Sequence, residues 1–524
     1  MKSLTELDKE VAAGNADVVS FINAITDEAS FVEADKFIGS GTSLGYVAGE
    51  GVVSGFAAIN DVQVGIFAIN GKTLLGGIGK KNAEKIAKCV NSAVKSDAPV
   101  IGVLDTAGAR FAEGIEALEG YGKIVKAFSE AYGIVPTVLV VKGNNFGSLA
   151  YLPAFCDFAV CYENSVTATT SPLILAAQSG TDVSKVGTAV VMADSGVSSF
   201  TVKNDDELKV LLGKLIDFTQ FPVTETEDDG NRMCSFAEKN SVYDVISQVF
   251  DKNSFLEIKK DFAGDVVTGF ARLNGIAVGV VANNAAAKDG YMSCKATEKV
   301  TDLINTLESL GMPLVNLVDC KGAANCLKCQ DALIKGLGEM MYALNVSSIE
   351  KIAVITGNAL GSAYIALANK SVYDYVIAWE EARIGMLDGE KSALLVYGDQ
   401  IAKADDKQKH DLAEQNDLPP VDFLIRLKMN VYQLRGRCTD QKRYHRDKVL
   451  HHVRPVLLEQ RRAQKNNVAR LRVGKNLAAT KVGICVLKSA GENDEHCRAE
   501  AVGHLSVQMK RLSDLHRRAP FPAQ

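Results

Sequence analysis

Backbone amides, rather than side chains, are the groups in this sequence whose arrangement could do chemistry. Two turns made mainly of small residues each follow an apolar run, at 105–110 and at 144–149. Glycine lets the backbone approach a ligand closely, so the N–H groups of such turns can stabilise a negatively charged oxygen in an oxyanion hole. The alternative interpretation is that both are simply tight turns that the fold requires.

Side-chain catalysis has little support in the sequence. All seven histidines lie at or after His410, so the preceding part of the chain has no imidazole base and no Ser-His-Asp triad. Cys320, Cys326 and Cys329 offer three sulfur atoms where structural zinc takes four ligands, so an ordinary structural role is favoured over a metal site. The Gly-Gly-Ile-Gly-Lys segment that ends at Lys80 lacks the Ser or Thr of a phosphate-binding loop.

Both turns occur twice, because the chain is an internal duplication with a constant shift of 214 positions (322 − 108 = 214 for Gly322 and Gly108). The matching stretches are 52–70 with 266–284, 98–110 with 312–324, and 143–148 with 357–362. A duplicated unit that cannot bury its own faces packs against its copy, so we expect two similar domains. Two equivalent pairs of turns suggest sites for two oxyanions.

The elements that must position these turns follow from the apolar pattern. Residues 52–70 alternate around Asn60-Asp61, which predicts two antiparallel strands. Ala83, Ile86 and Val90 then share one face of a helix. The next elements are expected at corresponding positions in both copies, as a strand at 98–104 or 312–318 and a helix at 113–132 or 327–345.

Each copy therefore runs strand, strand, helix, strand, turn, helix, strand and a second turn. Turns that follow parallel strands gather at the carboxyl edge of a sheet, where the start of the next helix leaves backbone N–H groups unpaired. We expect the turns at 105–110 and 144–149 to lie together at one such edge.

Composition bounds the class of protein. At 524 residues and 47% hydrophobic composition, the chain can bury two sizeable cores. No run approaches the roughly 18 to 20 apolar residues of a membrane helix, and the first residues lack the apolar segment of a signal peptide. These features predict a cytoplasmic protein. The eleven cysteines lie mostly in apolar runs, which is typical of buried, unpaired thiols rather than a disulfide framework.

Charge divides the chain into an acidic body and a basic tail. Residues 1–417 carry 36 Lys plus Arg against 54 Asp plus Glu, whereas 418–524 carry 22 against 9. Clustered basic residues can form an arm for nucleic acid or membrane surfaces, but such blocks are more often solvated or disordered. A shift of reading frame in the gene is the interpretation we favour, and no nucleic-acid partner is expected.

Several separate motifs resemble the carboxyltransferase subunits of biotin-dependent acyl-CoA carboxylases and decarboxylases. They are EGVVSGFAAIN, LLGGIGKKNAEKI, APVIGVLDTAGARFAEGIEALEGYGKI, GNALGSAYIALANK and YDYVIAWEEARIGML. The resemblance covers about residues 30 to 410 and implies an α/β fold of two tandem crotonase-like β-β-α domains related by internal duplication. The implied domains are a helical lead at 1–35, a first crotonase-like domain at 36–225, a second at 235–415, and an atypical basic tail at 418–524.

In that family, one pair of backbone N–H groups stabilises the thioester enolate of an acyl-CoA, and another stabilises the ureido oxygen of biotin. The resemblance implies that Ser148 and Leu149 form the first pair and that Ser362 and Ala363 form the second. Substrate-binding support is implied for neighbouring positions in the same turns, namely Ala107, Gly108, Ala109, Gly147, Gly322 and Gly361. Leu149 stands where the family has alanine, and its larger side chain is expected to crowd the thioester.

The resemblance also implies cofactors and partners. The substrate is a coenzyme A thioester, no metal is needed, and biotin is carried on a separate protein because the chain shows no Met-Lys biotinylation context. Partners are the biotin carrier, a biotin carboxylase or a membrane decarboxylase subunit, and further copies in a homo-dimer or homo-hexamer. Two alternatives stay open. One is a biotin-free crotonase-type hydratase or isomerase, against which the second domain argues, and the other is a catalytically silent scaffold subunit.

Overall fold

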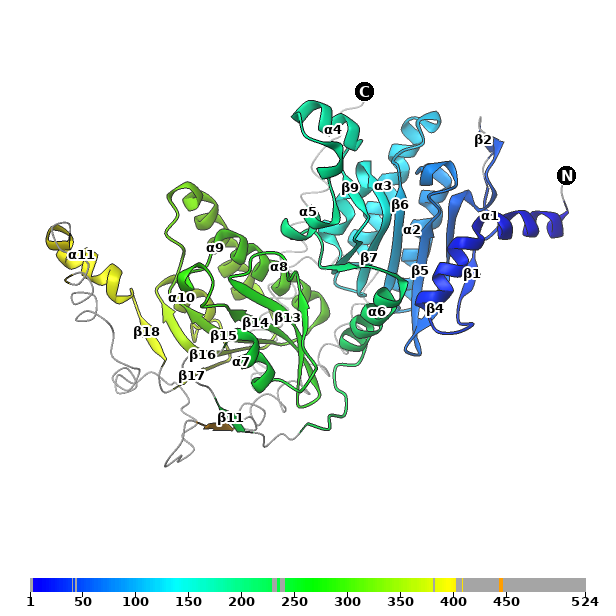
Figure 1. Ribbon diagram of the computed structural model, residues 1–524. Coiled ribbons are helices and arrows are strands. Elements are labelled where there is room, and N and C mark those ends of the chain that lie inside the picture. The colour runs from blue at the N-terminus through cyan, green and yellow to red at the C-terminus, as the bar shows by residue number, and fades with distance from the viewer. Residues whose placement is uncertain are drawn as a thin grey trace, which may run out of the picture. The chain divides into compact units, whose positions relative to one another are not determined.

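The computed structural model describes residues 3–401, apart from 40, 43–44, 229–232, 236–240 and 380–381, together with 408 and 443–445 (Figure 1). Apart from 443–445, the predicted basic tail at 418–524 lies outside the described residues.

The first sheet combines antiparallel and parallel pairing. In order of pairing, its strands are β1 (Val32–Ala34), β4 (Val52–Ile59), β5 (Val62–Ile69), β6 (Val100–Thr106), β7 (Thr137–Phe146), β8 (Phe158–Tyr162) and β10 (Phe200–Val202), with β9 (Val166–Ala168) beside β7. Strands β4 and β5 form the predicted antiparallel pair. Asn60 and Asp61 both have positive φ there, as a tight two-residue hairpin turn requires. From β5 onward the pairing is parallel.

The second sheet repeats this plan. Its strands, in order of pairing, are β12 (Leu256–Ile258), β13 (Val266–Leu273), β14 (Ile276–Asn283), β15 (Leu314–Cys320), β16 (Lys351–Leu360) and β17 (Tyr375–Ala378), with β18 (Arg383–Gly385) beside β16. The register shifts after Leu104 in the first sheet and after Val318 in the second, again 214 positions apart (318 − 104 = 214). The predicted duplication and the α/β fold class are confirmed.

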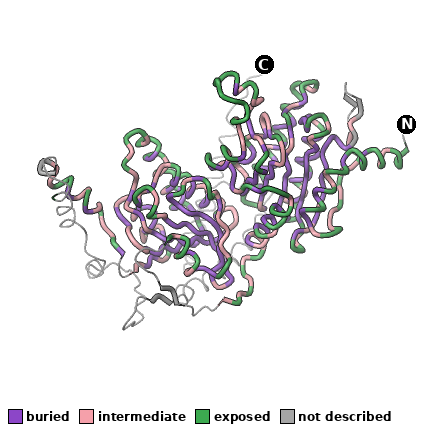
Figure 2. The backbone as a smooth tube through the Cα atoms, viewed as in Figure 1, coloured by how far each residue is buried: buried purple, intermediate pink, exposed green. Residues whose placement is uncertain are grey.

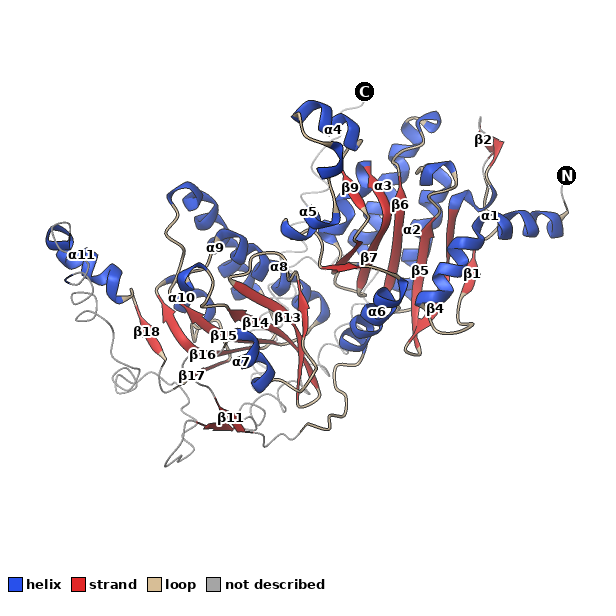
Figure 3. Cartoon of the chain, viewed as in Figure 1, coloured by secondary structure: helices blue, strands red, loops and turns tan. Residues whose placement is uncertain are grey.

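Helices join and cover the strands (Figure 3). They are α1 (Leu4–Ile25), α2 (Lys80–Lys95), α3 (Ile115–Ala131), α4 (Pro172–Ser179), α5 (Ala189–Asp194), α6 (Asp205–Gln220), α7 (Val242–Val249), α8 (Cys294–Leu310), α9 (Gln330–Val346), α10 (Ser362–Leu367) and α11 (Gly389–Ile401). Short 3-10 helices are η1 (Ala48–Gly51), η2 (Leu74–Gly76), η3 (Phe111–Glu113), η4 (Gly147–Phe155), η5 (Val183–Lys185), η6 (Lys288–Gly290) and η7 (Leu327–Cys329). Two small strand pairs are β2 (Gly41–Thr42) with β3 (Gly45–Tyr46), and β11 (Met233–Ser235) with β19 (Arg443–His445).

The two faces of the first sheet belong to two different cores. Along β5, Phe67 and Ile69 join a cluster with residues of α2 and α3. The alternate residues Ile66 and Ala68 join a larger cluster that also contains residues of α1, α6 and the second sheet. Figure 2 shows the buried residues running along the strands of both sheets. The larger cluster is therefore shared by the two copies.

Candidate functional site

Glycine turns at the carboxyl ends of the central strands form two equivalent loop pairs. The first loop pair consists of 107–110, after β6, and 147–149, after β7, and the second consists of 321–324 and 361–363. The two turns of the first pair lie together as expected, since a Cβ built on Gly147 would come within 3.6 Å of the Gly108 Cα. All four loop glycines have positive φ, a conformation that side chains disfavour: Gly108 at +115°, Gly147 at +78°, Gly322 at +108° and Gly361 at +51°.

Two of the positions predicted to support the first site already donate hydrogen bonds through their backbone amides. The Ala107 N–H donates to the Leu75 carbonyl at 2.9 Å, and the Gly108 N–H donates to the Thr106 hydroxyl at 3.1 Å. Ala109 forms a parallel bridge with Ile78. Ala107 and Gly108 therefore shape the turn through their amides. Among the described residues, the Ala109 N–H has no acceptor within the chain.

Arg110 anchors the end of this turn. Its guanidinium donates to the buried Glu50 carboxylate at 2.6 Å, to Glu113 at 3.2 Å and to the Gly77 carbonyl at 2.9 Å. The corresponding position in the second copy is Ala324 (324 − 110 = 214), so this anchor belongs to the first copy alone.

The first copy places Ser148 and Leu149 in the opening turn of η4. In a 3-10 helix, each N–H donates to the carbonyl three residues earlier. The first such bond of η4 runs from the Leu149 N–H to the Phe146 carbonyl. The N–H groups of Gly147 and Ser148 therefore lie ahead of the hydrogen bonds of this helix. The Leu149 side chain is 1% exposed and belongs to the core cluster beside α3. The expectation that it crowds the thioester is therefore wrong, because the side chain faces the core.

In the second copy an α-helix replaces the 3-10 helix. The first hydrogen bond of α10 is donated by the Ile365 N–H to the Gly361 carbonyl at 3.2 Å, so the amides of Ser362 and Ala363 lie ahead of the helical ladder. The Ala363 side chain is fully buried, which leaves its main chain as the group able to serve a ligand. The Ser362 hydroxyl accepts a hydrogen bond from the Ala323 N–H at 3.1 Å and thereby ties the two turns together.

A charged cluster that sequence reasoning missed lies beside the second loop pair. Tyr291, which follows η6, donates its hydroxyl to Asp388. The Lys391 ammonium lies 4.0 Å from the centre of the Tyr291 ring, and Lys321 lies 5.9 Å from it. Burial lowers the pKa of Lys391. No spacing rule connects residues 291, 321 and 391, so only the fold reveals the cluster.

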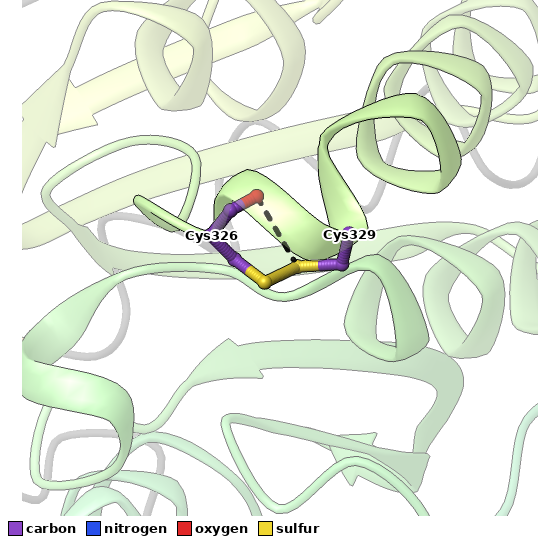
Figure 4. Close-up of a disulfide and its surroundings, with 2 residues drawn as sticks. All are labelled: Cys326 and Cys329. Atoms are coloured by element: carbon purple, nitrogen blue, oxygen red, sulfur yellow. Dashed lines mark hydrogen bonds between the residues drawn. A yellow bond between two sulfur atoms is a disulfide. The ribbon is translucent and has the colours of Figure 1, made fainter.

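Cys326 and Cys329 are joined by a disulfide directly after the second loop pair (Figure 4). The pair closes η7, and Cys329 is the residue that precedes α9. Buried, unpaired thiols, as predicted, are found at Cys89, Cys161 and Cys320. The fold brings together Cys326 and Cys329, for which a structural role is favoured over a metal site, at the start of a helix.

Two cavities in the described part of the chain lie away from both loop pairs. One, of about 540 Å³, is lined by residues that include Phe200, Lys214 and Lys260. The other, of about 460 Å³, is lined by residues that include Tyr132 and Asp157. Within the described ranges, no helix has the length and apolar character that crossing a bilayer requires.

Known proteins share this sequence and this fold. The carboxyl transferase domain family matches residues 9–463. The methylmalonyl-CoA carboxyltransferase 12S subunit of Propionibacterium freudenreichii subsp. shermanii is 29% identical over 431 residues, which cover 76% of this chain and 81% of the relative. The methylmalonyl-CoA decarboxylase subunit alpha of Veillonella parvula is 30% identical over 417 residues, or 75% of this chain and 82% of the relative.

Solved structures agree with these relatives. A transcarboxylase 12S structure, described as a hexamer with methylmalonyl-coenzyme A and methylmalonic acid bound, superposes with a TM-score of 0.74 at 26% identity and covers 82% of this chain and 90% of that one. A single-chain, multi-domain long-chain acyl-CoA carboxylase superposes with a TM-score of 0.69 at 19% identity, over 79% of this chain and 45% of that one, which supports the fold. The chain belongs to the carboxyl transferase domain family, a family of acyl-CoA carboxyltransferase enzymes.

Proposed function

We propose that the chain is the carboxyltransferase component of a biotin-dependent acyl-CoA carboxylase or decarboxylase. It moves a carboxyl group between an acyl-CoA thioester and biotin on a carrier protein. One observation carries the proposal: two equivalent glycine loop pairs, each with left-handed glycines, stand at the carboxyl edges of two sheets of the same topology. A reaction with an oxyanion on each of two substrates needs two such sites, whereas a hydratase or isomerase needs one.

The first loop pair is the proposed acyl-CoA site. The Ser148 N–H, which lies ahead of the 3-10 ladder, is the donor assigned to the thioester oxygen, and this oxygen becomes negatively charged when the α-carbon loses its carboxyl group or, in the opposite direction, its proton. The Leu149 N–H, the second predicted donor, makes the first hydrogen bond of η4 in the free protein and joins Ser148 only if that bond opens. Ala107, Gly108, Ala109 and Gly147 support this site by shape, because the absence of large side chains lets the main chain approach the thioester. The amides of Ala107 and Gly108 keep their bonds within the turn.

The second loop pair is the proposed biotin site. Biotin, when bound, supplies the ureido nitrogen that carries the carboxyl group. The N–H groups of Ser362 and Ala363 fit its ureido oxygen, since both lie ahead of the first hydrogen bond of α10. Gly322 and Gly361, with no Cβ, let the oxygen reach those donors.

Domain roles follow from this division. The first crotonase-like domain, residues 36–225, holds acyl-CoA, and the second, residues 235–415, holds biotin. The lead at 1–35 supports the first domain through α1, whose Phe21, Ile22 and Ile25 join the shared core. No catalytic group is assigned to residues 418–524.

The proposed assembly is a homo-dimer or homo-hexamer in which the first domain of one protomer faces the second domain of another. A large apolar side chain within three residues of the first turn in each loop pair supports association, because Phe111 is 97% exposed and Leu327 is 94% exposed. The 12S relative is itself described as a hexamer. A biotin carrier and either a biotin carboxylase or a membrane decarboxylase subunit complete the complex. A monomer in light scattering at micromolar concentration would contradict this assembly.

Carboxyl transfer to free biotin tests the proposed function. The purified full chain is mixed with biotin and, in turn, malonyl-CoA, methylmalonyl-CoA and glutaconyl-CoA, and loss of the carboxylated thioester is followed by chromatography. We expect at least one donor to be consumed only when biotin is present. Consumption without biotin would favour a different crotonase-type reaction, and no consumption of any donor would favour a scaffold subunit.

A further inference from the structure

A tyrosine hydroxyl is buried without a partner behind the first loop pair. Tyr121 on α3 is 5% exposed, and among the described residues its hydroxyl has no hydrogen-bond partner. It lies 4.0 Å from the position that a Cβ on Gly147 would occupy. A polar group left unpaired in a core is costly, so a sequence that keeps one needs a reason beyond packing.

A second unpaired atom flanks the same turn. Asn145, at the end of β7, is fully buried, and its side-chain oxygen has no partner within the described part of the chain. Its side-chain nitrogen donates to the Leu149 carbonyl at 3.4 Å, so the asparagine is already attached to this turn. A buried donor and a buried acceptor thus adjoin the turn that is proposed to hold the thioester oxygen.

The second copy shows that the fold does not need these polar groups. Gly120 packs against Ala83, and Gly336 packs against Thr297, which is 214 positions after Ala83, so the two helix glycines correspond. The residue that follows is Tyr121 in the first copy and Leu337 in the second. Likewise Asn145 pairs with Thr106 across the sheet, whereas the corresponding pair in the second copy is Ala359 with Cys320. The polar residues are specific to the first loop pair.

We propose that Tyr121 is a positioning residue for the acyl-CoA half of the reaction. Its hydroxyl gains a hydrogen-bond partner in the 147–149 turn when an acyl-CoA thioester binds there. The hydroxyl lies behind Gly147 and is shielded from solvent, so it acts through the turn and not on the thioester itself. This proposal rests on the proposed function, because it assigns the thioester to the first loop pair.

The protonation of Tyr121 suits such a role. Burial raises the pKa of its hydroxyl above the usual value for tyrosine, so the group remains a hydrogen-bond donor throughout the neutral range. Removal of the hydroxyl should therefore change the rate by the same factor at every pH between about 6 and 9. The pH profile of the variant should run parallel to that of the parent.

The variant Tyr121→Phe isolates the hydroxyl, because it keeps the ring and removes one oxygen. We expect kcat/KM for methylmalonyl-CoA, or for whichever thioester the parent uses, to fall about tenfold, in keeping with the net value of one hydrogen bond. KM for free biotin should stay the same. The melting temperature should stay the same or rise, since an unpaired buried hydroxyl contributes nothing to the stability of the free protein.

Tyr373→Phe is the matched control. Tyr373 is also buried, but its hydroxyl accepts a hydrogen bond from the Asn316 side chain at 3.0 Å. Its removal should lower the melting temperature and leave kcat/KM for the thioester close to that of the parent. The two variants thus distinguish a hydroxyl that acts when the thioester is bound from a hydroxyl that stabilises the free protein.

The proposal would be overturned if a folded Tyr121→Phe variant kept the kcat/KM of the parent. It would also be overturned if the melting temperature of Tyr121→Phe fell as far as that of Tyr373→Phe. If the parent transfers no carboxyl group, the proposed function fails, and calorimetric binding of methylmalonyl-CoA then tests Tyr121 separately. Parental binding at least about tenfold tighter than that of Tyr121→Phe would support the role of the hydroxyl. Equal binding, or no binding by the parent, would reject it.

Discussion

Main-chain amides at both loop pairs are partly hydrogen bonded within the chain, to partners that the sequence does not reveal. In the first copy the amide of Ala107 donates to the Leu75 carbonyl, and Leu75 reaches that position by adopting a left-handed conformation with φ of +54°. Leucine disfavours this conformation, so nothing in the sequence predicts it. The loop glycines could be predicted because positive φ is what glycine tolerates, whereas the partner of each amide could not.

Proline at position 363 tests the second loop pair directly. Ala363→Pro removes the N–H assigned to the oxygen of biotin, at a helix start where proline is tolerated. Loss of one oxyanion donor lowers turnover on the order of 100- to 1000-fold, so carboxyl transfer to biotin should fall by that factor while acyl-CoA affinity stays the same. Initial rates and calorimetric binding measure the two effects.

Ala363→Ser, which keeps the N–H, serves as the control and should retain most of the activity. Circular dichroism must show both variants folded, because position 363 is fully buried. Transfer at the parental rate by a folded Ala363→Pro variant would remove this turn from the proposed site.

Glu350, just before β16, predicts a dependence of stability on pH. The carboxyl is buried, one of its oxygens has no partner among the described residues, and Asp374 lies nearby. Burial, with a smaller effect of Asp374, raises the pKa of Glu350 to about 7. The folded state therefore binds more protons than the unfolded state between about pH 4.5 and 7, and the stability contributed by the protonated form is lost as pH rises through 7.

The Glu350→Gln variant should not show this loss of stability with rising pH. Melting temperatures measured from pH 5 to 8 should fall less with pH in the variant than in the parent, and at pH 8 the variant should be the more stable of the two. Glu339→Gln, on an exposed position of α9, is the control and should follow the parent. Parallel curves for parent and Glu350→Gln would show that this carboxyl does not carry the effect.

At the scale of the elements, the start of α9 shows the limit of prediction from periodicity. The sequence predicts a helix at 327–345, and the structure divides it into η7 and α9 (Gln330–Val346). The disulfide between Cys326 and Cys329 spans the join. Apolar spacing defines the face that a helix buries, but it carries no information about a covalent bond near the helix start.

Peptide mapping with trypsin should detect this disulfide. Cleavage after Lys321, Lys328 and Lys335 yields the peptides 322–328 and 329–335, each with one cysteine of the pair. In protein that is alkylated but not reduced, mass spectrometry should find these two peptides joined. After reduction they should separate, each with one alkylated thiol. Two separate alkylated peptides in unreduced protein would show that the bond is not formed.

At the scale of the whole molecule, the two copies share one apolar core. Phe158 on β8 and Phe270 on β13 meet edge to face, with ring centroids 5.7 Å apart, and Phe218 on α6 lies 5.6 Å from Phe270. The constant shift of 214 positions predicts two copies that pack together, and the structure confirms it. It does not predict α4, α5 and α6, which lie between the matching stretches.

Phe270→Ala should therefore destabilise the first copy as well as the second. Phe270 is fully buried, and truncation of a buried phenylalanine costs about 3 to 5 kcal/mol. Calorimetry of the variant should show one transition at lower temperature, because the shared cluster couples both copies. Val190→Ala, at a position on α5 that is 76% exposed, is the control for stability. A variant with one parental transition and one shifted transition would contradict this coupling.

The shared core also determines whether the two copies could be encoded by two separate genes. A gene split between the codons for α6 and α7 would yield two polypeptides, each with part of the shared cluster uncovered. Phe158 and Phe270 would then meet only when two chains associate, and a folding reaction that now needs one molecule would depend on concentration. Such a fission would therefore be tolerated only if both products were synthesised together and in similar amounts.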